Sequence, residues 1–257
     1  MFQTKKSLGQ NFLHDHNISR KIVNSTNPQK TDYFLEIGPG EGALTQFLLP
    51  AVSKYLAVEI DSRLIPILSE KFQDYENFKI INSDFLDFEL SQMPTNLRII
   101  GNLPYNATSP IIFQCLENYQ RIQDLTIMVQ KEVADRLSAN YGSKTYGILS
   151  VFLSVFGEVK KLFNVPPTVF FPKPKVDSAV VQIKFQNEFE LVNKDIFFRV
   201  VKASFGKRRK MISNSLAEVV KELNSEIPSD FAKLRPEQIK PEEFVLLTQK
   251  ILESVKK

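Results

Sequence analysis

Five short apolar runs that alternate with helix-like segments constrain the fold of this chain most strongly. The runs cover 33–38, 55–60, 78–85, 97–105 and 125–130, with segments typical of helices at 43–51, 62–72 and 110–119. Runs this short and this continuously apolar are typical of strands buried on both faces. Strands that alternate with helices build βαβ units, so the sequence predicts an α/β fold of Rossmann type with a parallel sheet.

The segments on either side of this alternation differ from it. A polar arm at 1–13 and a short helix at 14–26 precede it, and a helical segment is expected at 131–156. Strand-like runs near 158–165 and at 178–185 then predict a closing antiparallel pair. Beyond about residue 190 the apolar periodicity is helical only. We therefore predict a first domain at 1–188, which includes the arm, and a small all-helical domain at 189–257.

Composition narrows the functional classes. A chain of 257 residues is long enough to bury a substantial core, and it has no apolar run of membrane-spanning length and no signal-peptide pattern. The single cysteine, Cys115, excludes an intramolecular disulfide and fits a reducing cytoplasm. With only two histidines in the chain, a His/Cys zinc site is not expected. These features predict a cytoplasmic protein without a membrane or metal partner.

The basic residues are clustered. The net charge is +4, and Lys207, Arg208, Arg209 and Lys210 follow one another in a segment that the periodicity predicts to be helical. Such a cluster suits contacts to the phosphates of a nucleic acid, although a solvated basic surface would have the same composition.

Glycines follow the first apolar run in the stretch EIGPGEG. Gly38 and Gly40 lie where the chain turns from a strand into a helix, and glycine there lets the backbone approach a ligand closely. Glu59 ends the second run about 20 residues later, where an acid in a doubly wound fold accepts hydrogen bonds from ribose hydroxyls. The pattern predicts a cofactor that contains a nucleoside; the alternative is an ordinary strand-to-helix turn.

The glycine spacing identifies the class of cofactor. G-x-G-x-G preceded by Glu36 departs from the dinucleotide pattern G-x-G-x-x-G and resembles the first motif of S-adenosylmethionine-dependent methyltransferases. Asp84, at the end of the third run, is placed to accept a hydrogen bond from the adenine amine of that cofactor.

The stretch IIGNLPYNATSP at 99–110 ends the fourth run at the same sheet edge, beside the expected cofactor. The side-chain oxygen of Asn102 and the carbonyl of Leu103 can accept both hydrogens of a planar amine, drawing its nitrogen towards a tetrahedral geometry. Pro104 stiffens the loop, and Tyr105 offers a face on which a base can stack. These residues predict methyl transfer to the amine of a base, with rate supplied by positioning and electrostatics. The alternative is a strand end followed by a turn, with Asn106 and Pro110 ending the strand.

Four stretches together carry a more specific resemblance. KKSLGQNFLHD, EIGPGEGALT, GNLPYNATSP and VFFPKPKVDSAVV, in this order, resemble the family of ribosomal RNA adenine dimethyltransferases, over essentially the whole chain. The resemblance is best to bacterial small-subunit enzymes, and it implies dimethylation of two adjacent adenines near the 3′ end of 16S rRNA. It also implies an immature 30S particle as the partner, S-adenosylmethionine as the cofactor, and a helical C-terminal domain. The chain is expected to be a monomer.

The resemblance also carries residue roles. It places cofactor contacts on Asn11 and Leu13 of the arm, besides Gly38, Gly40, Glu59, Asp84 and Asn102. It further implies that Phe170 stacks on the target base opposite Tyr105. The adjacent Phe171 is an alternative that sequence does not separate, and Phe170 could instead be an ordinary core aromatic.

Two other functions fit parts of the same pattern. A large-subunit adenine methyltransferase of the macrolide-resistance type shares the fold and the Asn-x-Pro-Tyr motif, but LGQNFLHD, FPKPKVDS and GKRRK resemble the small-subunit enzymes. A non-catalytic factor for ribosome assembly or nucleic-acid binding would use the basic cluster alone. The intact residues of the predicted site argue against that reading.

Overall fold

A computed structural model describes residues 9–186, 189 and 191–255 of the chain. The first residues of the predicted arm and the predicted domain boundary at residue 188 lie outside these ranges. The chain divides into two compact units. The sheet unit comprises Met1–Ala134 and Val159–Phe185, and the helical unit comprises Asp135–Glu158 and Gln186–Lys257. The contacts thus group 135–158 with the C-terminal helices, whereas the boundary drawn from the sequence remains a prediction.

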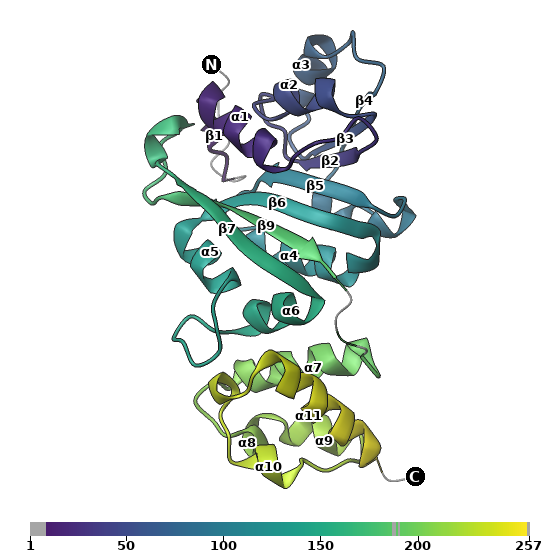
Figure 1. Ribbon diagram of the computed structural model, residues 1–257, viewed down its shortest axis with the longest axis vertical. Helices are drawn as coiled ribbons and strands as arrows, with labels where there is room; N and C mark the ends of the chain where they lie inside the picture. The colour runs from purple at the N-terminus through teal and green to yellow at the C-terminus, as the bar shows by residue number, and fades with distance from the viewer. Residues whose placement is uncertain (1–8, 187–188, 190, 256–257) are drawn as a thin grey trace. The chain divides into compact units, whose positions relative to one another are not determined.

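The sheet unit is built on a sheet of seven strands in the order β4-β3-β2-β5-β6-β9-β7 (Figure 1). Its neighbouring pairs β4/β3, β3/β2, β2/β5 and β5/β6 are parallel, as the alternation of strands and helices predicts, and β6/β9 is antiparallel. The strands are β2 (Tyr33–Ile37), β3 (Lys54–Glu59), β4 (Phe78–Asn82), β5 (Leu97–Asn102), β6 (Ile122–Gln130), β7 (Gly157–Val165) and β9 (Ser178–Phe185). The prediction of an α/β fold is confirmed.

A second, two-stranded sheet joins the arm to the start of the stretch FFPKPKVDS at 170–178. Strand β1 (Phe12–Leu13) pairs antiparallel with β8 (Phe170–Phe171), so that Phe12 lies opposite Phe171 and Leu13 opposite Phe170. The His14 amide continues this contact by donating to the Val169 carbonyl at 3.0 Å. The arm is therefore held beside the sheet rather than left as a free tail from residue 12 onwards.

Helices pack against the strands through alternating side chains. Phe34, Tyr55 and Ile100 belong to one buried cluster that also takes apolar residues of three helices. Because side chains alternate along a strand, Glu36 and Asn102 lie on the same face as this cluster. The helices of this unit are α1 (His16–Ser25), α2 (Thr45–Leu48), α3 (Leu64–Lys71), α4 (Thr108–Glu117) and the start of α5 (Lys131–Leu137), with short 3₁₀ turns at Leu49–Ala51, Phe85–Asp87, Leu90–Gln92, Tyr119–Arg121 and Pro167–Val169.

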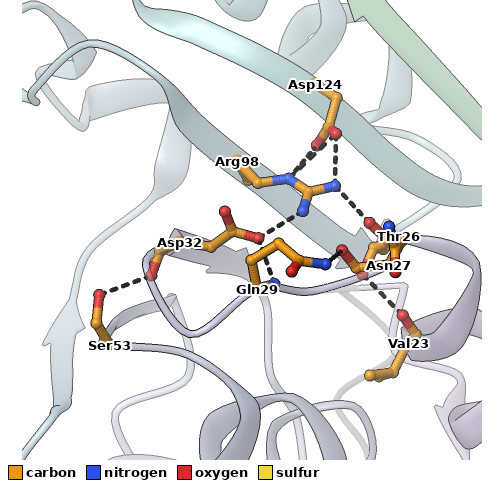
Figure 2. A network of polar contacts seen from close by, with 8 residues as sticks. All are labelled: Val23, Thr26, Asn27, Gln29, Asp32, Ser53, Arg98 and Asp124. Carbon is orange, nitrogen blue, oxygen red and sulfur yellow. Dashed lines mark hydrogen bonds and ion pairs between the residues drawn. The ribbon is translucent and has the colours of Figure 1, made fainter.

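A buried polar network closes the amino end of the sheet (Figure 2). Arg98, near the start of β5, donates to Asp124 on β6, to Asp32 before β2 and to the Thr26 carbonyl at the end of α1. Its guanidinium carbon also lies 4.7 Å from the centre of the Phe34 ring. One side chain thereby links two strands, a loop and a helix terminus.

The helical unit holds α6 (Ile148–Phe156), α7 (Lys194–Gly206), α8 (Ile212–Ser215), α9 (Ala217–Glu222), α10 (Ser229–Ala232) and α11 (Pro241–Glu253), with a 3₁₀ turn at Pro236–Gln238. Aromatic contacts form much of its core: the Phe152 and Phe198 rings stack with centres 4.2 Å apart. The expected helical character of the chain beyond residue 190 is confirmed for the described residues.

Two expectations about helices are wrong. The segment 131–156 is not one helix, because a loop that contains Gly142 with a φ of +79° separates α5 from α6. The basic residues 207–210 are not helical either. They form the turn between α7 and α8, and α7 ends at Gly206 just before them. Glycine lowers helix propensity at both places.

Candidate active site

A cleft opens at the carboxyl edge of the parallel strands. The empty space between its walls is about 740 Å³, a figure that includes space open to solvent. Its walls come from the arm, the loops after β2 and β3, and the end of β5. The lining residues are Gly9, Gln10, Asn11, Phe12, Leu13, Glu36, Gly38, Pro39, Gly40, Glu41, Ala43, Leu44, Glu59, Ile60, Asn102, Leu103, Pro104 and Tyr105. The structure thus brings together most of the residues predicted from sequence.

The glycine loop after β2 adopts the backbone that its sequence predicts. Gly38 and Gly40 have φ angles of +64° and +59°, which residues other than glycine rarely adopt. A Cβ added to Gly38 would meet nothing within 4 Å, so this position borders open space in the cleft. A Cβ added to Gly40 would lie 2.9 Å from the Phe12 ring of the arm. One glycine therefore leaves room for a ligand, and the other lets the arm close over the loop.

Glu59 stabilises the glycine loop from the end of β3. One carboxylate oxygen accepts from the Gly40 amide at 3.1 Å, and the other accepts from the Asp61 amide at 2.8 Å. Burial raises the pKa of this carboxyl, and the two backbone donors act against that shift. A carboxylate has about four acceptor positions, so Glu59, which lines the cleft, retains acceptor capacity.

Glu36 is the second buried acid of the cleft, and sequence reasoning gave it no role. Its Oε2 atom accepts from the Thr45 hydroxyl at 2.5 Å and from the Tyr55 hydroxyl. Burial raises the pKa of Glu36 to about 7, against the effect of these two hydrogen bonds. Thr45 and Tyr55 lie 9 and 19 residues from Glu36, so only the parallel pairing of β2 with β3 and the packing of α2 bring them together.

Asn102 faces the cleft at the end of β5 and is oriented by the arm. Its side-chain nitrogen donates to the Asn11 carbonyl at 2.9 Å, which directs the amide oxygen elsewhere. Among the described residues, neither that oxygen nor the Leu103 carbonyl accepts a hydrogen bond. Asn11 thus contributes through its backbone, and two acceptors from consecutive residues remain available to a ligand.

The aromatic residues of the site differ in exposure. The Tyr105 ring lines the cleft, and its hydroxyl shares a hydrogen bond of 2.9 Å with Ser178. Burial raises the pKa of Tyr105, so the phenol stays protonated. Phe170 is 5% exposed and belongs to the apolar cluster under the arm, whereas its neighbour Phe171 is 45% exposed. In this arrangement stacking of a base is open to Phe171, and the role implied for Phe170 stays a prediction that requires its ring to become accessible.

Besides Phe170, two predicted groups lie outside the cleft lining. Asp84 is not part of the cleft lining; it accepts from the Leu86 amide at 2.9 Å and caps a short 3₁₀ turn, beside the Ser83 amide that donates to the Glu59 carbonyl. The basic residues 207–210 belong to the helical unit. Leu13 lines the cleft but is also buried in the core.

The arm carries a residue that the sequence did not single out. Gln10 lines the cleft and donates to Asp61 at 3.1 Å, and Asp61 also pairs with Arg63 at 2.6 Å. These hydrogen bonds hold the pKa of Asp61 well below its usual range. The stretch GQNFL indicated an arm, but nothing local in it showed that Gln10 would reach the loop after β3.

No group of three or more His, Cys, Asp or Glu side chains among the described residues is placed to hold a metal ion. No helix in that part of the chain is long and apolar enough to cross a membrane.

Comparison with known proteins places this geometry in a family. Residues 1–249 match the family model described as ribosomal RNA adenine dimethylase. The chain is 43% identical over 253 residues to "Ribosomal RNA small subunit methyltransferase A" of Francisella tularensis subsp. novicida (strain U112), covering 95% of this chain and 96% of that protein. The protein of the same description from Francisella tularensis subsp. tularensis (strain WY96-3418) matches equally, with 43% identity over 253 residues.

Solved structures of two related methyltransferases superpose on this chain over almost its whole length. A dimethyladenosine transferase from Plasmodium falciparum superposes with a TM-score of 0.83 and 26% identity, covering 95% of this chain and 98% of that one. The 23S rRNA methyltransferase ErmE superposes with a TM-score of 0.72 and 27% identity, covering 94% and 99%.

Proposed function

The chain belongs to the ribosomal RNA adenine dimethylase family, and from that premise we propose that it methylates two adjacent adenines near the 3′ end of 16S rRNA. The methyl donor is S-adenosylmethionine, and each adenine amine receives two methyl groups. The proposed substrate is an immature 30S particle in the cytoplasm, and the protein acts as a monomer. The 43% identity to small-subunit methyltransferases supports this target over large-subunit RNA.

The observation that carries the proposal is the unused oxygen of Asn102. The arm holds the amide nitrogen through the Asn11 carbonyl, so the orientation of the side chain is fixed before any ligand arrives. Its oxygen and the Leu103 carbonyl then accept the two hydrogens of the adenine amine. This draws the nitrogen lone pair out of conjugation with the ring. The loop is stiffened by Pro104, and Tyr105, anchored through Ser178, offers a face for the base.

The cleft fits the proposed donor. When bound, S-adenosylmethionine supplies an activated methyl group on a sulfonium ion. The open space at Gly38 admits the ligand close to the backbone, and the remaining lone pairs of Glu59 suit ribose hydroxyls. Asp84 keeps one carboxylate oxygen beyond its bond to Leu86, and we assign it to the adenine amine of the donor. Because the residues preorganise both reactants, positioning supplies much of the rate.

The turn 207–210 is the proposed contact to rRNA phosphates. Within it, Lys207 pairs with Glu218 at 3.3 Å, and Arg208 donates to the Lys144 carbonyl at 3.0 Å. Arg209 and Lys210 are exposed and form no salt bridge with the residues that the structure describes. We therefore assign most of the phosphate binding of this turn to Arg209 and Lys210.

The test is mass spectrometry of adenines after incubation with labelled S-adenosylmethionine. Immature 30S particles and protein-free large-subunit RNA are compared as substrates. Two adjacent dimethyladenines near the 3′ end of 16S rRNA are expected in the first and none in the second. Modification of the large-subunit RNA alone would replace the proposal by the macrolide-resistance type of activity. Particle binding without any methyl transfer would leave a non-catalytic assembly factor.

A further inference from the structure

Three segments of the helical unit meet around the loop that separates α5 from α6. The Gly142 amide donates to the Glu237 carbonyl at 3.1 Å, and the Tyr146 hydroxyl donates to the Ile239 carbonyl at 3.0 Å. From the turn after α7, Arg208 donates to the Lys144 carbonyl at 3.0 Å. The loop is therefore fastened to two other segments of the helical unit, and the Tyr141 side chain takes no part in these three hydrogen bonds.

Two tyrosines of this loop have opposite environments. Tyr146 is fully buried, with its hydroxyl bonded to the backbone. Tyr141 is 50% exposed, although a tyrosine ring in a protein usually buries most of its apolar area. The ammonium of Lys240 lies 5.3 Å from the centre of the Tyr141 ring. This distance makes a cation–π contact, and half of the Tyr141 residue stays exposed beside it.

The cations of the loop, and of the turn that Arg208 fastens to it, differ in whether they have partners. Arg208 is bound to the loop, and its Nε atom lies 3.9 Å from the Glu237 carboxylate, a distance that makes an ion pair but no hydrogen bond. Lys144 is exposed, and so are Arg209 and Lys210 in the turn that Arg208 fastens to the loop. In the part of the chain that the structure describes, none of these three side chains has a salt-bridge partner.

We propose that this surface, formed by Tyr141, Lys144, Arg209, Lys210 and Lys240, binds an unpaired nucleotide of the rRNA substrate. The base stacks on Tyr141, and the uncommitted cations bind the phosphates on either side of it. An aromatic face next to free cations is the combination that binds single-stranded nucleic acid. A base inside a duplex has no free face, so the surface selects a loop, bulge or end.

The inference deepens the proposed function, since the RNA bound is the substrate assigned above. It adds a second point of contact on the helical unit, separate from the adenine that is methylated. Binding there holds the substrate without taking part in methyl transfer. It therefore affects the Kd for RNA and the KM for particles, and leaves kcat unchanged.

The experiment measures the Kd of the full-length protein for protein-free 16S rRNA and for immature 30S particles, over a series of salt concentrations. Tyr141→Ala is expected to weaken binding about 10- to 100-fold without changing the salt dependence, because stacking releases no counterions. Tyr141→Phe keeps the ring and should bind like the native protein. The matched control is Tyr75→Ala, which removes another exposed tyrosine, in the sheet unit.

The charges are tested by a double variant, Arg209→Gln with Lys210→Gln. It should lower the slope of log Kd against log salt by about 1.5 to 2. 16S rRNA containing 4-thiouridine should form a photocrosslink to Tyr141 at an unpaired position, identified by mass spectrometry. Native binding by Tyr141→Ala, or a crosslink only to paired nucleotides, overturns the inference.

The outcomes separate this inference from the proposed function. If Tyr141→Ala binds normally while adenines of 16S rRNA are still dimethylated, the inference fails and the proposed function stands. If Tyr141→Ala loses binding but the native protein methylates no small-subunit RNA, the surface is a nucleic-acid site and the proposed substrate is wrong. An equal loss of affinity in Tyr75→Ala and Tyr141→Ala assigns the effect to general destabilisation and overturns the inference.

Discussion

The two ends of the parallel sheet use the same strands for opposite purposes. At the amino end, the buried guanidinium of Arg98 is bonded to Asp124, Asp32 and the Thr26 carbonyl, and its neighbours satisfy it on several sides (Figure 2). At the carboxyl end of the same strand, the Asn102 oxygen accepts nothing from the described residues. The network at the amino end is closed, and the site at the carboxyl end keeps acceptors free.

The acids show the same contrast. Asp124 is neutralised by a direct contact of 2.6 Å with Arg98. Glu36 and Glu59, buried at the other end, accept hydrogen bonds from hydroxyl and amide donors. Burial raises the pKa of all three carboxyls, so the two ends differ in the partner of each acid and not in the direction of its pKa shift. A polar group that is fully paired contributes to fold stability, whereas one left incompletely paired is available to a ligand. The comparison therefore predicts that substitutions at the amino end change stability and those at the carboxyl end change catalysis.

Arg98→Ala should have the largest effect, because it leaves the Asp124 and Asp32 carboxylates without their cation in a buried site. We expect a loss of about 3–5 kcal/mol in the free energy of unfolding, measured by urea denaturation. At a temperature where the variant stays folded, kcat should be unchanged. The control is Arg199→Ala, which breaks the exposed pair with Glu222 and should cost less than about 1 kcal/mol. Equal losses in the two variants would refute the structural role of the network.

Asn102→Ala tests the carboxyl end of the parallel sheet. Removing a preorganised group that acts on the reacting atoms should lower kcat by about 10²- to 10³-fold. Urea denaturation should show little change, and RNA binding should persist. Asn106→Ala is the matched control, because Asn106 is exposed in the same loop and lies outside the cleft lining. Turnover in Asn102→Ala within a few-fold of the native rate would remove the assigned role.

The strands and the residues at the carboxyl edge of the sheet could be predicted from the sequence, because both depend on short local patterns of residues. Short apolar runs identified the strands, and the positions of Gly38, Glu59 and Asn102 at run ends placed them at one sheet edge, because parallel strands share a direction. The observed lining of the cleft confirms that these residues lie together. Their individual roles in catalysis and cofactor binding remain predictions.

The sequence did not reveal contacts that depend on register. Arg98 lies opposite Asp124 only because of the pairing of β5 with β6, and charged residues at strand ends look like ordinary surface positions. The Tyr55 hydroxyl meets Glu36 for the same reason. The basic residues 207–210 were wrongly expected in a helix. The apolar periodicity is helical both before and after them, and Gly206 is the only local sign that a helix ends there.

Glu36 makes the ligand-free protein less stable as the pH rises. Its pKa of about 7 in the fold exceeds the ordinary value of 4.5, so the folded state binds more protons between these values than the unfolded chain does. Stability is then greatest below pH 4.5 for this group and falls up to about pH 7, by at most about 1.4 kcal/mol per pH unit.

Glu36→Gln keeps an acceptor for Thr45 and Tyr55 but has no proton to lose. Urea denaturation between pH 5 and 8 should therefore show a flatter decline for the variant than for the native protein. Glu59, whose pKa is also raised, contributes to the remaining slope in both proteins. Parallel pH profiles of the two proteins would show that Glu36 is already ionised in the fold.

Gln10→Ala should have the smallest effect, and together with Gln29→Ala it compares the two ends of the sheet with one type of substitution. The variant loses the hydrogen bond of 3.1 Å from the arm to Asp61, while Asp61 keeps its pair with Arg63. Losing one such bond costs about 0.5–1.5 kcal/mol, so the KM for the methyl donor should rise roughly 2- to 10-fold. Gln29→Ala makes the same change in the exposed loop beside the Arg98 network, and its KM should equal the native value (Figure 2). An unchanged KM in Gln10→Ala would show that the arm closes the cleft through Phe12 and Asn11 alone.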